Sequence, residues 1–84
     1  MRAIIDDNVY DTEYAILLAT CQYDEGLTGQ LYISSSGDFF LVGGLPEQIC
    51  PLHPITAEYW SQRFAGREVY LEVCRLNHLL KWKR

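Results

Sequence analysis

Apolar and polar positions alternate over much of the first half of the chain, and this pattern favours β-strands. Residues 13–23 are ambiguous. Every second residue from Ala15 to Tyr23 is apolar, as in a half-buried strand. A helical repeat fits as well, through Tyr14, Leu17, Leu18 and Cys21. We favour a strand here, preceded by a single helical turn at residues 11–13.

A β-hairpin is predicted after a loop at residues 24–29. Its strands are residues 30–34 and the apolar run 39–42, and the small residues 35–38 supply the turn. Residues 45–54 contain all three prolines of the chain. Because proline has no backbone N–H to donate to a sheet, we expect this segment to be irregular.

The clearest helix signal lies near residues 56–65. Thr56 is predicted as the N-cap, because its hydroxyl can accept hydrogen bonds from amides of the first turn. Trp60 and Phe64 follow at helical spacing, and Gly66 suits the position after the last turn. The sequence therefore predicts a short helix of about three turns.

The cleanest strand pattern lies further along the chain. Val69, Leu71 and Val73 are apolar at alternate positions, so residues 68–74 are predicted to form a strand. Residues 76–84 fit either a final strand or a turn of helix. The elements together predict a single α+β domain of all 84 residues. In it, an antiparallel sheet of about four strands packs with one short helix.

The composition is typical of a folded protein. Hydrophobic residues make up 49% of the 84 residues and charged residues 21%. The sequence has no apolar run of the ~18 residues that a membrane-spanning helix needs, and no apolar signal segment follows Met1. Three cysteines without a C-x-x-C pair argue against a disulfide framework. We expect a cytoplasmic protein whose cysteines are reduced and buried.

Charge is distributed unevenly along the chain. Residues 1–58 contain nine carboxylates and one base, a formal charge of −8. Residues 59–84 contain six bases and two carboxylates, a formal charge of +4. Such a field bears on partners and association rates more than on the fold.

Two short Cys/His pairs form the most metal-like constellation. Cys50 and His53 give a C-x2-H pair, and Cys74 and His78 give a C-x3-H pair. The number of ligands suits tetrahedral zinc, but the arrangement is not that of a standard zinc finger. Because free cysteine is commonly an inert core residue, zinc is the weaker alternative, and no cofactor is predicted.

The sequence contains no recognisable catalytic constellation. His53 and His78 are the natural general bases, and neither stands in a triad-like sequence. The serines at residues 34–36 are typical turn residues. A basic tail with Trp82 could contact phosphates, but the net charge of −4 disfavours direct nucleic-acid binding. We therefore expect a protein without enzymatic activity.

An acidic surface with tyrosines is the remaining candidate site. The chain has eleven aromatic residues, more than one small core readily covers, and tyrosines beside carboxylates are typical of interfaces. The candidate partner-binding residues are Asp6, Asp7, Asp11, Glu13, Asp24, Glu25, Tyr10, Tyr14 and Tyr23. This surface suits a basic partner, including a protein that normally holds nucleic acid.

Several short segments follow one another along the chain in a characteristic order. They are Val9-Tyr10-Asp11-Thr12-Glu13, then Leu31-Tyr32 with Ser36-Gly37-Asp38-Phe39-Phe40-Leu41, and then Ile49 to Pro54 ahead of a helix with Trp60. Their order resembles a widespread group of small uncharacterised bacterial and phage proteins. The group reads Y-D-T-E-x-A, then L-Y-x(4)-G-x-[YF]-F-L, then I-x-P-L before a Trp-containing helix. The resemblance covers about two thirds of the chain.

The resemblance implies a small α+β fold encoded by a phage or another mobile element, and it implies no catalytic residues. Small acidic proteins of such elements inhibit host defence complexes by stoichiometric contact, as anti-CRISPR proteins do in basic nucleic-acid channels. We expect a non-enzymatic binding protein of this kind. The alternative is a homodimeric structural or assembly protein, in which the strand at residues 68–74 pairs across a two-fold axis. A small regulatory module, associated with nucleic acid or zinc, ranks third.

Overall fold

The computed structural model describes the backbone of residues 1–24, 26–44 and 46–83, and their side chains except those of residues 23, 24 and 81–83. The elements are β1 (Arg2–Ile5), β2 (Asn8–Asp11), a 3-10 turn η1 (Thr12–Tyr14), β3 (Ile16–Asp24), β4 (Leu27–Ile33), β5 (Phe39–Gly43), β6 (Gln48–Leu52), α1 (Pro54–Phe64) and α2 (Arg67–Lys83). The fold is therefore α+β, as the sequence predicts.

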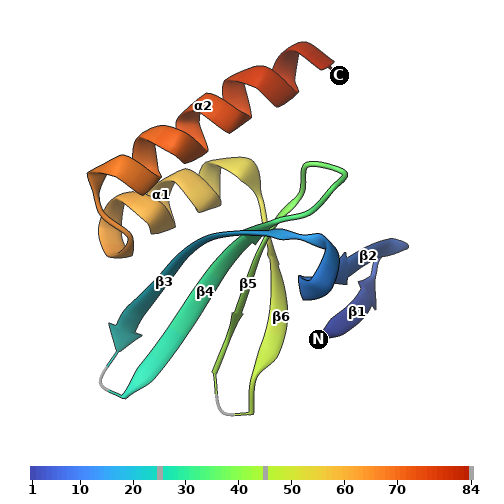
Figure 1. The fold of residues 1–84 in the computed structure, drawn as a ribbon, viewed down its shortest axis with the longest axis vertical. Helices are drawn as coiled ribbons and strands as arrows, with labels where there is room; N and C mark the ends of the chain where they lie inside the picture. Colours follow the sequence, from blue (N-terminus) through green and yellow to red (C-terminus); the bar gives the residue numbers. More distant parts are fainter. Residues whose placement is uncertain (25, 45, 84) are drawn as a thin grey trace.

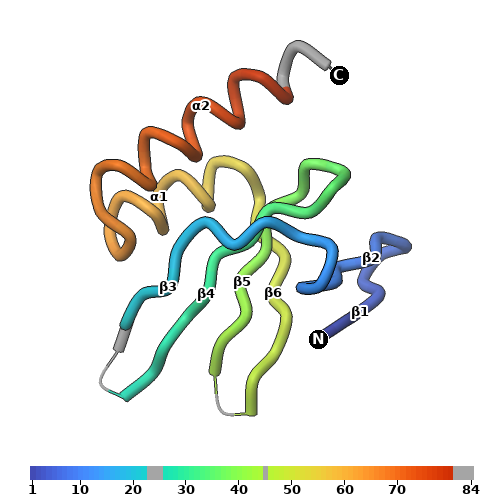
Figure 2. Tube along the Cα trace, viewed as in Figure 1, coloured from blue at the N-terminus to red at the C-terminus, as the bar shows by residue number. Residues whose placement is uncertain are grey.

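Four strands form an antiparallel meander in the order β3-β4-β5-β6, and β1 and β2 form a separate antiparallel hairpin. Figure 1 shows the two helices stacked together, away from the β1–β2 hairpin. The tube in Figure 2 traces the green β4–β5 turn between the helices and that blue hairpin.

The central strands of the meander are buried on both faces, and this divides the core into two clusters. Leu31 and Phe39 lie at or below 1% exposure on one face, and Phe40 lies at 0% on the other. Because successive side chains of a strand point to opposite faces, the adjacent residues Phe39 and Phe40 belong to different clusters.

The larger cluster joins the sheet to the helices. Its buried members are Leu31, Ile33, Phe39, Ala57 and Val73. Partly buried apolar side chains surround them, namely Leu18, Leu41, Leu52, Trp60, Val69, Leu76 and Leu80. Burial of this apolar surface is the main source of stability for the helix-covered face.

The smaller cluster joins the opposite face of the sheet to the N-terminal hairpin. The ring of Tyr10 meets Phe40 edge-on, with centroids 5.4 Å apart and planes at 63°. Tyr32 stacks on the same ring of Phe40 at 5.2 Å and 10°. These offset and edge-to-face arrangements are the favourable ones for aromatic pairs. The cluster therefore fixes where the hairpin sits on the sheet.

The strand predicted at residues 68–74 is wrong, because the segment belongs to α2. The described part of the chain thus has two α-helices where one was expected. Val69, Val73, Leu76 and Leu80 recur at helical spacing and pack on the larger cluster. Leu71, which completed the apparent alternation, is 52% exposed. Over the seven residues 68–74, the apolar positions fit both the two-residue repeat of a strand and the 3.6-residue repeat of a helix. Only the pattern over the whole of α2 distinguishes the helix from the strand.

Helix α1 begins two residues before the predicted cap. His53 is the N-cap, and its Nδ1 accepts a hydrogen bond from the backbone N–H of Ile55 at 3.2 Å. Pro54 occupies the first turn, where its missing N–H costs nothing. Thr56 therefore lies inside the first turn. Gly66, with φ +90°, follows the last turn as predicted.

Residues 45–54 were expected to be irregular, and this expectation is wrong for residues 48–52, which form β6. Pro51 lies opposite Phe40 on this strand, which has β5 as its neighbour. An edge strand tolerates proline because the position without an N–H can face outward. The preferred strand at residues 13–23 is confirmed by β3, and the short helical turn before it by η1.

A comparison of two glycines tests how α2 packs on the β4–β5 turn. A Cβ on Gly37 (φ +89°) would lie 2.8 Å from Cδ2 of Leu80, whereas a Cβ on Gly66 (φ +90°) would meet nothing within 4 Å. Both Gly→Ala changes carry backbone strain of about 1–2 kcal/mol. We expect Gly37→Ala to lower the free energy of unfolding more than Gly66→Ala does, as measured by urea denaturation.

The double-mutant cycle with Leu80→Ala supplies the control. Removing the Leu80 methyl groups should reduce the cost of Gly37→Ala to that of Gly66→Ala, because only strain remains. Equal costs for the two glycines in the native background would show that Leu80 does not crowd Gly37.

Candidate functional site

The turn between β1 and β2 places two carboxylates at the tip of the N-terminal hairpin. Asp6 and Asp7 have φ values of 51° and 67°, and Ile5 pairs with Asn8 across them. Two central residues with positive φ define the turn that best matches the twist of a hairpin, and aspartate tolerates this conformation better than most residues. The backbone conformation of the turn therefore favours aspartate at residues 6 and 7, and these two residues also place two negative charges at the tip of the hairpin.

Local hydrogen bonds hold the segment that follows β2. Oδ1 of Asp11 accepts the backbone N–H of Glu13 at 3.0 Å and so caps η1. The backbone N–H of Thr12 donates to the carbonyl of Met1 at 2.9 Å, and the Met1 ammonium donates to the Thr12 hydroxyl at 2.9 Å. These hydrogen bonds fix the backbone at residues 11–13 and so position Tyr14, the next residue.

The β4–β5 turn is built from serines and one carboxylate. The Oγ of Ser34 accepts the backbone N–H of Asp38 at 3.0 Å, and the Ser36 hydroxyl donates to Oδ2 of Asp38 at 3.1 Å. The backbone N–H of Ser34 also donates to the carbonyl of Asp38 at 2.8 Å. The turn is thus held at both ends, and it places Asp38 near the N-terminal hairpin.

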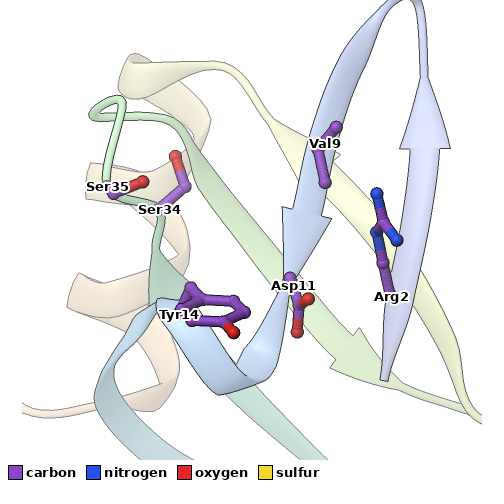
Figure 3. A pocket seen from close by; sticks show the side chains of 6 residues that line it. All are labelled: Arg2, Val9, Asp11, Tyr14, Ser34 and Ser35. Atoms are coloured by element: carbon purple, nitrogen blue, oxygen red, sulfur yellow. The ribbon is translucent and has the colours of Figure 1, made fainter.

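An open hollow of about 410 Å³ lies between this turn and the N-terminal hairpin. We call it the Tyr14 hollow; its lining residues are Arg2, Val9, Asp11, Tyr14, Ser34 and Ser35. Figure 3 shows the Tyr14 ring between the two serines on one side and Asp11 on the other, with Arg2 beyond Asp11. Tyr14 is 74% exposed, so its ring is available to a visiting group.

Carboxylates from two turns act on one buried hydroxyl. Burial is the main cause that raises the pKa of Tyr10 above its ordinary value of 10.0, and the charges of Asp38 and Asp6 raise it further. These two aspartates come from the β4–β5 turn and the β1–β2 turn. Asp38 and Asp6 therefore both lie near enough to Tyr10 to act on its hydroxyl.

Not all the predicted partner-binding residues belong to this region of the surface. Asp6, Asp7, Asp11, Glu13 and Tyr14 do, and together with Asp38 they form what we call the acidic face. Tyr10 is 6% exposed and packs on Phe40, so its ring is a core group and not a surface anchor. The side chains of Tyr23 and Asp24, and Glu25 as a whole, lie outside the described residues.

The sequence did not indicate the other residues of the site. Arg2 lies opposite Asp11 in the β1–β2 hairpin. A sequence prediction of strands at residues 2–5 and 8–11 would have placed these two residues opposite each other. Ser34, Ser35 and Asp38 come close only through the meander. No sequence pattern signals that contact.

The four residues of the zinc alternative are engaged elsewhere or lie apart. His53 caps α1, and Cys74 Sγ donates to Oε1 of Glu58 at 3.0 Å. Cys50 and His78 are exposed. Within residues 1–24, 26–44 and 46–83, no three His, Cys, Asp or Glu side chains are arranged to hold a metal ion.

The contacts of Cys74 favour a thiol and not a thiolate. Burial, followed by the hydrogen bond to Glu58, raises the pKa of Cys74 above its ordinary 9.0. Asn77 donates to the other Glu58 oxygen, Oε2, and to the carbonyl of Pro54, both at 3.0 Å. The side chains of Cys74 and Asn77 therefore link α2 to Glu58 and Pro54 of α1 through hydrogen bonds.

All three cysteines are free. Cys50 is exposed, so the expectation of buried thiols is wrong there.

A second hollow, of about 230 Å³, lies on the helix-covered side of the meander. Its lining includes Trp60, Leu41 and Cys50, with Gly29 and Gly43 opposite each other in the sheet. It is smaller and more apolar than the Tyr14 hollow, and no ionised side chain is among its described lining residues. The acidic face is therefore the better candidate site.

No protein-family model, curated protein or solved structure matches this chain. Neither α1 nor the described part of α2 combines the length and apolar character that a membrane-spanning helix requires.

The raised pKa of Tyr10 makes stability depend on alkaline pH. The folded state holds the phenolic proton more tightly than the unfolded chain does, so this contribution is present below about pH 10 and is lost as pH rises through the folded pKa. We expect Tyr10→Phe to make the free energy of unfolding fall less steeply between about pH 9 and pH 11. Urea denaturation across this range measures the slope.

Tyr59→Phe, at a ring that is 62% exposed on α1, is the matched control. It should leave the slope unchanged. The same slope in wild-type protein and Tyr10→Phe would contradict the assignment of this alkaline sensitivity to Tyr10.

Proposed function

We propose that this protein is a non-enzymatic binding module that presents the acidic face to a basic protein partner. The observation that carries the proposal is the placement of four carboxylates on the N-terminal hairpin and η1, namely Asp6, Asp7, Asp11 and Glu13, with Asp11 lining the hollow beside the exposed ring of Tyr14. Against them stand the guanidinium of Arg2 and the Met1 ammonium. A surface of this sign and composition suits lysine- and arginine-rich surfaces.

The mode of action follows from electrostatics. Basic channels that hold nucleic acid bind phosphates through Lys and Arg, and carboxylates on a rigid scaffold can occupy the same groups. Charge complementarity raises the association rate, and salt screens it over a Debye length of about 8 Å at physiological ionic strength. Such an inhibitor acts by stoichiometric occupation and needs no catalytic group.

The biological setting is part of the same proposal. The ordered sequence pattern resembles small phage and mobile-element proteins, and an acidic mimic of nucleic acid is useful to such an element when a host defence complex must be blocked. We therefore propose an inhibitor of a nucleic-acid-handling host defence complex, of the anti-CRISPR type, that acts in the cytoplasm.

The homodimeric alternative loses its edge strand, because residues 68–74 are helical, and retains the opposed formal charges of residues 1–58 and 59–84. Recovery of the protein as a dimer, with no other partner, would nevertheless favour it over the inhibitor. The zinc-binding version of the third alternative has no cluster of ligands in the described part of the chain.

Neutralising the acidic face should weaken partner capture. In the variant Asp6→Asn/Asp7→Asn/Asp11→Asn/Glu13→Gln, asparagine retains the turn and cap geometry while four charges are removed. We expect about tenfold weaker binding or more, since exposed ion pairs contribute about 0.2–1 kcal/mol each. Tagged protein is used to capture partners from host lysate at low and high salt, and phage plating on a defended host reports inhibition.

A matched pair of variants separates location from total charge. Asp6→Asn/Asp7→Asn and Glu47→Gln/Glu68→Gln remove the same number of charges, and only the first pair lies on the acidic face. The first should reduce capture and phage plating, and the second should not. Equal effects of the two pairs, or capture that is insensitive to salt, would contradict the proposed surface.

A further inference from the structure

We infer that the Tyr14 hollow receives an arginine side chain of the basic partner. This inference rests on the proposed function and names the contact that its surface makes. Three features of the described residues support it, namely the size and mixed lining of the hollow, the exposed aromatic ring, and the carboxylate of Asp11 in the lining.

The lining matches an arginine in its two chemical parts. Val9 and the ring of Tyr14 offer apolar surface to an aliphatic stem, and Val9 is 47% exposed. Asp11 and the hydroxyls of Ser34 and Ser35 offer oxygen acceptors to the polar end. Long basic side chains are typically bound in this way, with the stem on apolar surface and the charge at polar groups.

The ring of Tyr14 favours guanidinium over ammonium. A guanidinium stacks flat on an aromatic face and retains N–H donors at its edge for a carboxylate and hydroxyls, which a compact ammonium cannot do. Figure 3 shows Asp11 beside this ring and the serine pair above it. A cation stacked on Tyr14 therefore has a carboxylate and two hydroxyls in the lining of the same hollow.

Asp11 has an oxygen available for this role. Its Oδ1 accepts the N–H of Glu13, and in the described part of the chain no side chain or backbone donor bonds to Oδ2. The formal charge of −8 on residues 1–58 favours the approach of a cation to this part of the molecule.

Arg2 is the resident competitor for the hollow. It lies opposite Asp11 in the β1–β2 register and lines the same space, yet no ion pair within 4.0 Å joins these two described residues. A second guanidinium that enters the hollow meets the like charge of Arg2. Removing Arg2 should therefore tighten binding of the guest.

The probe is a short peptide of alternating arginine and glycine, titrated into the full chain at low salt and followed by calorimetry. Its lysine and citrulline versions test the cation, since citrulline retains the shape of arginine without the charge. We expect the arginine peptide to bind more tightly than the lysine peptide, and the citrulline peptide to lose binding. Equal binding of the arginine and citrulline peptides overturns the inference.

Variants of the protein then test whether the arginine peptide binds at the Tyr14 hollow. Tyr14→Ala should weaken binding of the arginine peptide by about threefold or more, and Tyr14→Phe should retain it. Asp11→Asn, which preserves the cap on η1, should also weaken binding. Arg2→Ala should tighten binding, whereas Arg67→Ala, with the same change of charge at the first residue of α2, should change it less.

The outcomes separate this inference from the proposed function. Unchanged peptide binding in Tyr14→Ala and Asp11→Asn, or equal effects of Arg2→Ala and Arg67→Ala, overturns the arginine site, even where neutralisation of the acidic face still abolishes partner capture. Conversely, a peptide response that follows these variants supports the arginine site, even where no defence complex is inhibited and the proposed function fails.

Discussion

The packing of Tyr10 on Phe40 is the contact on which the candidate site depends. Phe40 lies at 0% exposure in the middle of the meander, and Tyr10 brings the N-terminal hairpin against it. Ile5 and Ala15 add contacts to the same cluster. Every acidic residue before β3 is carried on the segment that this cluster positions. The aromatic core therefore decides where the negative charge is displayed.

Carboxylates contribute to the local structure of this segment as well as to its charge. Asp6 and Asp7 occupy the left-handed turn, Asp11 caps η1, and Asp38 closes the β4–β5 turn through Ser34 and Ser36. Small polar residues are common at such positions because their side chains replace missing backbone partners. Local hydrogen bonds thus hold Asp11 and Asp38 in place, and groups that are already held lose less conformational entropy when a partner binds.

The parts of the fold that the sequence predicted are those fixed by local chemistry. The apolar run at residues 39–42, the helix around Trp60 and Gly66 after it follow from neighbouring residues alone. The errors have two origins. Residues 68–74 fit a strand over a short window, and only the longer apolar repeat through Leu76 and Leu80 indicates the helix. Tyr10 is buried because Phe40 packs on it, and this tertiary contact has no local signal. The Tyr14 hollow joins segments that only the meander brings together.

The fold places many of the acidic residues and many of the basic residues of the sequence on different parts of the molecule. The acidic face lies on the N-terminal hairpin and the β4–β5 turn, while Arg63, Arg67 and Arg75 lie on the helices. Glu72 pairs with Arg75, so part of the helical charge is already neutralised. Glu58 and Glu68 offset further positive charge on the helices. For the basic partner that we propose, attraction is therefore expected at the hairpin and not at the helix layer. Because these forces act before contact, they favour an approach with the hairpin toward that partner.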